Sequence, residues 1–148
     1  WAKVERLNSA VDSMSSASVQ ERGNQYWVEK QTHGEHVVSP AHRGAMVGIA
    51  ENRDCTVKVS SETFAILCID TCHGVTVEFN KTMVQTYVAN SDRIEINCRA
   101  SPSIMLNNVN DAVISWEGTP GNVIYVCNSR GISVRKKGGE MAENLPDC

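Results

Sequence analysis

Two cysteines and a histidine lie close together in the segment FAILCIDTCHGVTVEF, residues 64–79. Cys68, Cys72 and His73 are residue types that ligate zinc or provide a reactive thiol. A structural zinc site needs four ligands, so partners from other segments would have to join these three. Whether they do chemistry therefore depends on whether the segment is unique in the chain or one copy of a repeat.

The segment is one of five similar segments along the chain. Each has an apolar strand end, a short polar corner and then strict alternation of apolar and polar residues. The five segments are 48–59, 68–79, 87–98, 105–116 and 125–136. Matching positions in them, which we call anchors, are Ile49, Ile69, Val88, Leu106 and Val126. Successive anchors are 20, 19, 18 and 20 residues apart, so the chain repeats with a nearly constant period.

This period and the alternation together predict the fold. Apolar residues at every second position indicate strands with one buried face. A repeat of about 19 residues is too short for a propeller blade and fits one coil of a β-helix, in which stacked coils share a continuous core. We therefore predict an all-β domain over residues 23–148, a right-handed parallel β-helix of about six short coils. Trp27 is expected to fill the core of an irregular first coil.

Residues 1–22 differ from the repeat and are predicted to be an N-terminal extension. Apolar residues recur there at steps of three and four, which is typical of a short amphipathic helix, and a serine-rich linker follows. These apolar residues are Trp1, Val4, Leu7, Val11 and Met14. Such a helix could bind a partner, or it could pack on the coils or fray.

The repeat favours a packing role for the cysteines. Cys72 occupies the corner position that other coils fill with Asn52, Ser91, Val109 and Ser129. Cys68 precedes an anchor and is predicted to point outward, with no second Cys/His cluster in the neighbouring coils. The other three histidines of the chain are scattered through a polar loop, at His33, His36 and His42. We expect no metal site, and we expect the six cysteines to be reduced.

Composition and motifs exclude several functions. The formal net charge of −3 gives no global attraction to nucleic acid or anionic membrane, and no apolar run approaches the ~20 residues of a membrane span. The chain has no GxSxG, P-loop or HExxH motif. We therefore predict that the protein is not an enzyme and binds no cofactor.

The outward positions of the strands offer a binding surface instead. Lys58, Glu78, Glu95 and Arg135 form a mixed-charge ladder there. Opposite charges on adjacent strands help strand pairing a little, and a flat charged sheet also suits a protein partner. These four residues are the candidate binding residues, and no catalytic residue is assigned.

The chain also resembles a known family, the C-terminal (CARP) domain of cyclase-associated protein. The similarity rests on YWVEKQ, on AMVGIAENRDCTVKVSSETFAILCIDTCHGVTVEF, and on ISVRKKGGE followed by LP, and it covers about residues 24–146. The resemblance implies a β-helical module that binds monomeric actin, prefers ADP-actin and speeds exchange of ADP for ATP, so that monomers are recycled for filament turnover. It also implies a cytoplasmic protein associated with the cytoskeleton.

The same resemblance implies a homodimer formed by swapping a C-terminal hairpin. That hairpin would comprise residues 122–127 and 131–136. Its interface residues would be Val123, Ile124, Tyr125, Val126, Ile132 and Val134.

Two other interpretations remain. A β-helix of the tubulin-cofactor-C type would act on a small GTPase through an exposed arginine in a Q-x-R sequence on one coil. We expect no Q-x-R sequence in this chain, and the matching coil strands are TVKV and TVEF. A β-helical scaffold for another protein partner is the second alternative.

Overall fold

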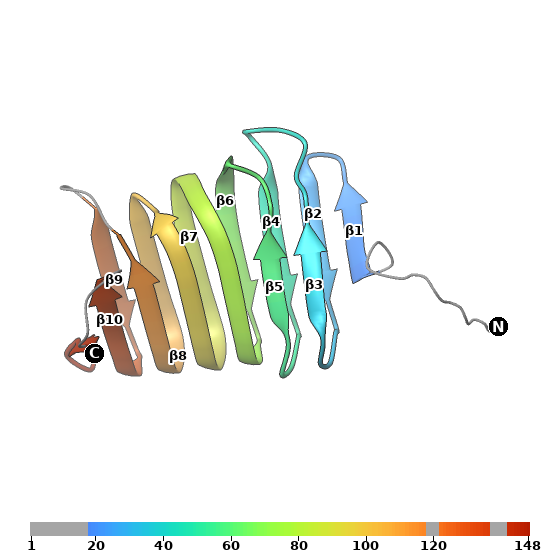
Figure 1. Ribbon diagram of the computed structural model, residues 1–148. Helices are drawn as coiled ribbons and strands as arrows, with labels where there is room; N and C mark the ends of the chain where they lie inside the picture. The colour runs from blue at the N-terminus through green and yellow to red at the C-terminus, as the bar shows by residue number, and fades with distance from the viewer. Residues whose placement is uncertain (1–17, 118–121, 137–141) are drawn as a thin grey trace.

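The chain winds into one parallel β-helix. The computed structural model describes residues 18–117, 122–136 and 142–148. In each coil the chain rises through a front strand, crosses at the top and descends through a rear strand, and this path is right-handed (Figure 1). No α-helix occurs among the described residues. The predicted all-β, right-handed parallel β-helix is therefore confirmed.

In the part of the chain that the structure describes, eleven strands form a single continuous sheet. Two of them, β7 and β8, bend around corners and so contribute to both the front and the rear of the helix. The strands are β1 (Val19–Arg22), β2 (Gln25–Glu29), β3 (Glu35–Val38), β4 (Met46–Ala50), β5 (Thr56–Val59), β6 (Thr63–Asp70), β7 (His73–Ala100), β8 (Ser103–Trp116), β9 (Val123–Cys127), β10 (Arg130–Lys136) and β11 (Ala142–Asn144).

Parallel pairing aligns the coils in the register that the repeat predicts. Ile49 is opposite Ile69, and Ile69 is opposite Val88. Leu106 is in turn opposite both Val88 and Val126. The first coil joins the same row through Val28, which pairs with Ile49. Six anchors therefore stack in one row, as about six short coils require.

The core consists of inward-facing rows between the front and rear strands. The anchors Ile49, Ile69, Val88 and Leu106 are fully buried. Near the top crossover the column is filled by Phe64 and Phe79. Their rings are edge to face with centroids 5.7 Å apart, a favoured aromatic arrangement.

Each lower corner is turned by two residues in the left-handed region, the second and fifth after the anchor. Their φ values lie between 49° and 70°. The second positions are Lys30, Glu51, Thr71, Asn90, Asn108 and Asn128. The fifth positions are His33, Asp54, Gly74, Arg93, Asp111 and Gly131. Left-handed backbone costs about 1–2 kcal/mol for a non-glycine residue, so the hydrogen bonds between coils must offset this cost in each coil.

An antiparallel strand covers one sheet edge at each end of the helix. At the N-terminal end β1 pairs with β2, and at the C-terminal end β11 pairs with β10. The last residues continue along β10, where Leu145 N donates to Ile132 O (2.9 Å) and Cys148 N donates to Ser129 O (3.1 Å). Both ends thus use antiparallel pairing to satisfy part of an exposed edge.

Several sequence expectations differ from this structure at the ends. The predicted extension reached residue 22, but Val19–Arg22 form β1, and the predicted helix at residues 1–14 lies outside the described residues. The two strands of the predicted C-terminal hairpin, β9 and β10, do not pair with each other, because each pairs in parallel with β8. They form the sixth coil and are not hydrogen-bonded to each other.

Trp27 is not the core plug that the sequence suggested. Its neighbours Tyr26 and Val28 are buried, so alternation turns Trp27 to the outside. Its ring covers Gly48 of the next coil, where an added Cβ would lie 2.5 Å from Cζ3 of the indole. The absence of a side chain at Gly48 therefore gives Trp27 its place on the outer surface.

Candidate functional site

The candidate site is the outer surface of the front strands, which we call the strand face. It is formed by β3, β5, β10 and the stretches 75–79, 94–98 and 112–116 of β7 and β8. Parallel strands are spaced about 4.8 Å apart. Lys58 is opposite Glu78, and further along the same row Asn97 is opposite Ser115, which is opposite Arg135. Lys58 and Arg135 are therefore four strand spacings apart, which is about 19 Å.

Lys58 is the centre of a small ion-pair network on this face. Its Nζ is 2.6 Å from Glu35 Oε2 and 4.0 Å from Glu78 Oε1. The hydrogen bond to Glu35, followed by the charges of Glu35 and Glu78, raises the pKa of the Lys58 amine. The network joins three successive coils, but ion pairs this exposed to water contribute little to stability.

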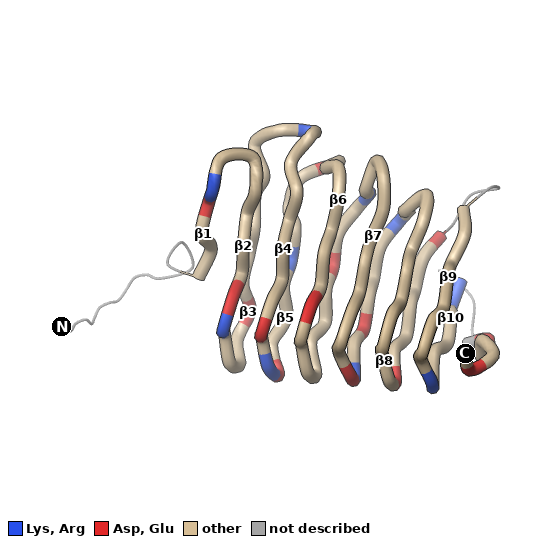
Figure 2. The backbone as a smooth tube through the Cα atoms, turned by 180° about the vertical axis from the view of Figure 1, so that it is seen from behind, with Lys and Arg blue, Asp and Glu red and all other residues tan. Residues whose placement is uncertain are grey.

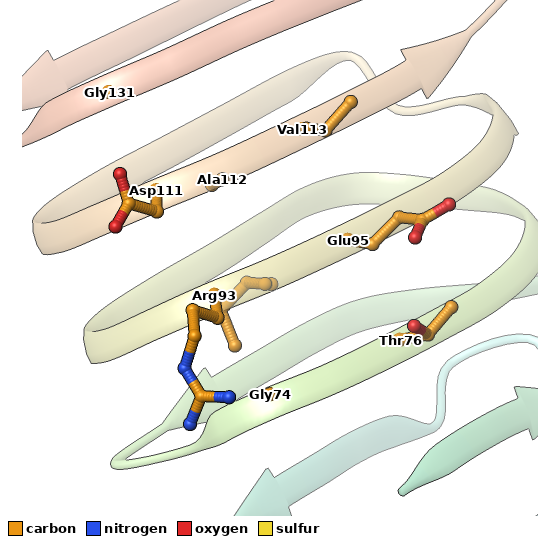
Figure 3. Close-up of a pocket in the computed structure, with 9 residues that line it drawn as sticks. Gly74, Thr76, Arg93, Glu95, Asp111, Ala112, Val113 and Gly131 are labelled. Carbon is orange, nitrogen blue, oxygen red and sulfur yellow. The ribbon is translucent and has the colours of Figure 1, made fainter. Parts of the chain in front are cut away.

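Three of the four predicted residues line two different shallow hollows. Lys58 and Glu78 line one hollow of ≈470 Å³. Glu95 lines another of ≈510 Å³ together with Arg93 and Asp111 (Figure 3). Glu95 lies on a different row from Lys58 and accepts a hydrogen bond from Asn97 Nδ2 at 3.2 Å.

Arg135 is exposed on β10 in the last coil, and no ion pair joins it to another described residue. The structure therefore puts all four predicted residues on one face, brings Lys58 and Glu78 together, and leaves Glu95 and Arg135 separate.

The hollow around Glu95 contains residues that the sequence analysis did not select. Arg93 extends across Gly74, which leaves room for it, and reaches Asp54 at 3.7 Å (Figure 3). An added Cβ at Gly74 would lie 2.6 Å from Asp54 Oδ1. Gly131 likewise leaves room for the carboxylate of Asp111. Extending the repeat alignment to the fifth corner position would have shown this row of charged residues and glycines.

His73 belongs to a charged ladder along the lower corners rather than to a metal site. Acidic and basic residues both occur along these corners, in some coils side by side in the same corner (Figure 2). His73 Nδ1 is hydrogen-bonded to Asp92 Oδ1, and Arg93 Nε donates to Asp92 Oδ2 at 3.2 Å. The hydrogen bond from His73, with a smaller effect of Arg93, lowers the pKa of the Asp92 carboxyl.

Cys72 is a buried corner residue, as the repeat predicted. It is fully buried, and its Sγ donates weakly to Ile49 O at 3.4 Å. Its backbone N–H donates to Ser91 Oγ at 3.0 Å, and Ser129 accepts from Val109 N in the same way at 2.9 Å. Burial raises the pKa of the Cys72 thiol to about 11. A thiol of this kind packs and is poorly nucleophilic at neutral pH.

The remaining cysteines and histidines do not converge on a metal site. Among the described residues, no three His, Cys, Asp or Glu side chains gather closely enough to hold a metal ion. All six cysteines are free thiols, and Cys68 is half-buried on the outer rear surface, where the sequence placed it. His36 Nε2 is hydrogen-bonded to the backbone oxygen of His33 at 3.1 Å.

The expectation that the chain has no Q-x-R sequence is wrong, because one occurs at Gln20–Arg22. It lies in the antiparallel strand β1. Arg22 Nη2 is bound to Glu29 Oε1 at 2.6 Å and to Gln20 Oε1 at 2.7 Å. Its guanidinium also lies 5.7 Å from the centroid of the Trp27 ring. This arginine therefore has its contacts within the chain, although its side chain is half exposed.

The residues predicted for the swapped hairpin lie in the sixth coil. Val123 and Tyr125 are exposed to 42% and 52%, which is high for apolar side chains in a strand. Ile132 is buried in the core. The other three pack against the core while partly exposed: Ile124, Val126 and Val134.

None of the described residues forms a helix with the length and hydrophobicity that crossing a membrane requires.

Comparison with known proteins identifies the family. The crystal structure of cyclase-associated protein from Cryptosporidium parvum is similar, with a TM-score of 0.79, 16% identity, and coverage of 88% of this chain and 84% of that chain. At this identity the likeness shows the fold alone. A search of curated proteins finds no match. A family model described as adenylate cyclase associated (CAP) C terminal matches residues 15–143. Since this match covers most of the 148 residues, the chain belongs to the CAP C-terminal domain family.

Proposed function

We propose that this domain binds monomeric actin through the strand face and promotes exchange of ADP for ATP on it. The observation that carries the proposal is the CAP C-terminal match over residues 15–143, because this is an actin-binding family. The strand face supports it physically. Successive coils hold its side chains in register, so a partner would meet a surface that loses little conformational freedom on binding.

The exchange activity follows from selective binding and needs no covalent chemistry. If the strand face binds an opened conformation of actin more tightly than the closed one, binding shifts actin toward the opened state. Nucleotide then leaves faster, and ATP replaces ADP. Lys58, Glu78, Glu95 and Arg135 are the proposed contacts. They lie outside the buried core, so they can change partners without disturbing the coils.

The proposal extends to preference and assembly. We propose that ADP-actin is the preferred form, that the protein acts in the cytoplasm with the cytoskeleton, and that it forms homodimers by swapping C-terminal strands. The exposed Val123 and Tyr125 on β9 support dimerisation, since a partner strand or sheet would cover them. A swapped pair would exchange parallel strands of the sixth coil, because β9 and β10 both pair with β8.

The direct test is release of a fluorescent nucleotide from ADP-actin monomers, titrated with this chain. Saturable acceleration is the expected result, with weaker binding to ATP-actin in a parallel titration. Absence of both binding and acceleration would contradict the proposal. Binding without acceleration would retain the actin contact and reject the exchange activity. Sedimentation at several concentrations would test the homodimer separately.

A further inference from the structure

A bulge in β7 exposes two neighbouring apolar residues at the top crossover. Opposite this bulge, β6 has one residue between the partners of Thr82 and Gln85, whereas β7 has two, Met83 and Val84. In a regular strand one of two neighbours would face inward. The extra residue breaks the alternation. Met83 and Val84 are consequently 46% and 52% exposed, unlike most large apolar side chains of the coils.

The bulge borders a hollow with basic side chains. The hollow measures ≈370 Å³, and its lining includes Arg43, Thr63, Lys81, Met83 and Pro102. Arg43 comes from the loop between β3 and β4, and Lys81 is paired with Thr63 across coils. Arg43 and Lys81 have no ion-pair partner among the described residues.

The local charge of this hollow is opposite to that of the chain. Its lining contains two cations, Arg43 and Lys81, and no acidic residue. Glu62 is next to Thr63 in the chain but does not line the hollow. The whole chain carries a formal net charge of −3. Two cations that have no ion-pair partner among the described residues, beside exposed apolar side chains, are a favourable combination for binding, because one partner segment can satisfy both.

Buried hydroxyls hold this crossover in place. Thr82, between Lys81 and Met83, is turned inward and 1% exposed. Its Oγ1 lies 2.6 Å from Ser101 Oγ, which lies 3.0 Å from Thr86 Oγ1. This fully buried network links two coils and fixes the backbone on both sides of the bulge. The exposed side chains are therefore presented from a rigid base.

We propose that this crossover surface, made of Arg43, Thr63, Lys81, Met83, Val84 and Pro102, docks an acidic segment of a protein partner that carries a bulky apolar side chain. The partner's carboxylates would pair with Arg43 and Lys81, and its apolar side chain would cover Met83 and Val84. The crossover surface is on the opposite side of each coil from the charged lower corners. It is separate from the proposed actin contacts, and it requires neither actin binding nor nucleotide exchange.

The test is a titration of the ¹⁵N-labelled chain with a capped peptide, Glu-Asp-Glu-Leu-Phe-Glu-Asp, followed by NMR. Saturable shifts of the backbone amides of residues 63, 81–84, 100 and 101 are expected. Arg43→Glu with Lys81→Glu should weaken binding about tenfold or more, since like charges then oppose each other. Met83→Ser with Val84→Ser, and a peptide with Ser-Ser in place of Leu-Phe, should each weaken it about tenfold as well.

The matched control is Lys58→Glu with Arg135→Glu, which changes the net charge equally on the strand face. This variant should bind the peptide with less than a twofold change, which separates local pairing from net charge. The proposal is overturned by absent or unsaturable shifts at the crossover surface, by equal losses in the charge variant and its control, or by no loss in the apolar variant. The dispersion of each variant's spectrum reports directly whether it has folded.

Discussion

The indole of Trp27 covers Gly48 so closely that a Cβ at residue 48 would lie 2.5 Å from Cζ3. Gly48 is buried, and its backbone lies in β4 beside β2. We expect Gly48→Ala to lower the free energy of unfolding by about 1–3 kcal/mol, because the added methyl forces the indole to move. Urea unfolding monitored by circular dichroism measures this loss.

The matched control for Gly48→Ala is the double variant Trp27→Leu, Gly48→Ala compared with Trp27→Leu alone. Without the indole the alanine should cost much less. Equal costs in the two backgrounds would show that the indole does not restrict residue 48.

Asp92→Asn should lower stability near neutral pH and have little effect in acid. The hydrogen bond from His73, and then Arg93, lowers the pKa of folded Asp92 below its ordinary value of 3.8. The ionised carboxyl therefore stabilises the fold above pH 3.8, and this contribution is lost as pH falls through the folded pKa. Its size should be no more than about 1 kcal/mol, since the pair is exposed. A loss of stability in Asp92→Asn that is as large at pH 2.5, about one unit below the ordinary pKa of 3.8, as at neutral pH would contradict this.

Reversing Lys58 and Arg135 together should weaken actin binding at least about tenfold without unfolding the domain. Lys58→Glu would oppose Glu35 and Glu78, whose carboxylates lie 2.6 and 4.0 Å from its amine. Co-sedimentation is unsuitable for monomers, so fluorescence anisotropy of labelled actin is the measurement. The control reverses Lys30 and Arg130, which lie on the lower corners. Equal losses in both variants would remove the strand face from the proposed contact.

The thiols should separate into fast and slow classes with a thiol reagent at pH 8. Cys127 and Cys148 are exposed and should react fast. Burial raises the pKa of Cys72 to about 11, so this thiol should stay protonated and unreactive until the protein unfolds. Two fast thiols are expected in the wild type and none in the variant Cys127→Ser, Cys148→Ser. A fast phase that survives in this variant would show that the half-buried Cys68 or one of the buried cysteines is accessible to the reagent.

Ser129→Ala should cost about 1–3 kcal/mol of stability, because it leaves the buried N–H of Val109 without an acceptor. Ser129 Oγ accepts that N–H at 2.9 Å and donates to Cys127 O at 2.8 Å. Ser133→Ala, on the outer surface of β10, is the control and should change stability by less than about 0.5 kcal/mol. Equal thermal midpoints for the two variants would contradict a supporting role for Ser129.

The coil register could be predicted from sequence for two reasons. Alternation decides which side chains of a strand face inward, and parallel stacking places the equivalent residues of successive coils opposite each other. Val57 is opposite Val77, and Ile96 is opposite Ile114, as the aligned segments require. A slip by one residue would turn every apolar side chain outward, so the pattern specifies the pairing strongly. The corner position of Cys72 was predictable for the same reason.

Other features were decided by tertiary structure, because they depend on neighbours that the repeat does not encode. Alternation along β2 already turns Trp27 outward, but where its ring lies depends on Gly48 in the next coil, which makes room for it. The bulge that exposes Met83 and Val84 depends on how β7 pairs with β6. At the C-terminal end, β10 pairs with β8 on one side and with β11 on the other. The last coil has a neighbouring coil on only one side, so its other edge is open and can pair with a strand from outside the repeat. The repeat in the amino-acid sequence therefore specifies the stacked coils, whereas contacts between coils decide what their outer surface and their ends look like.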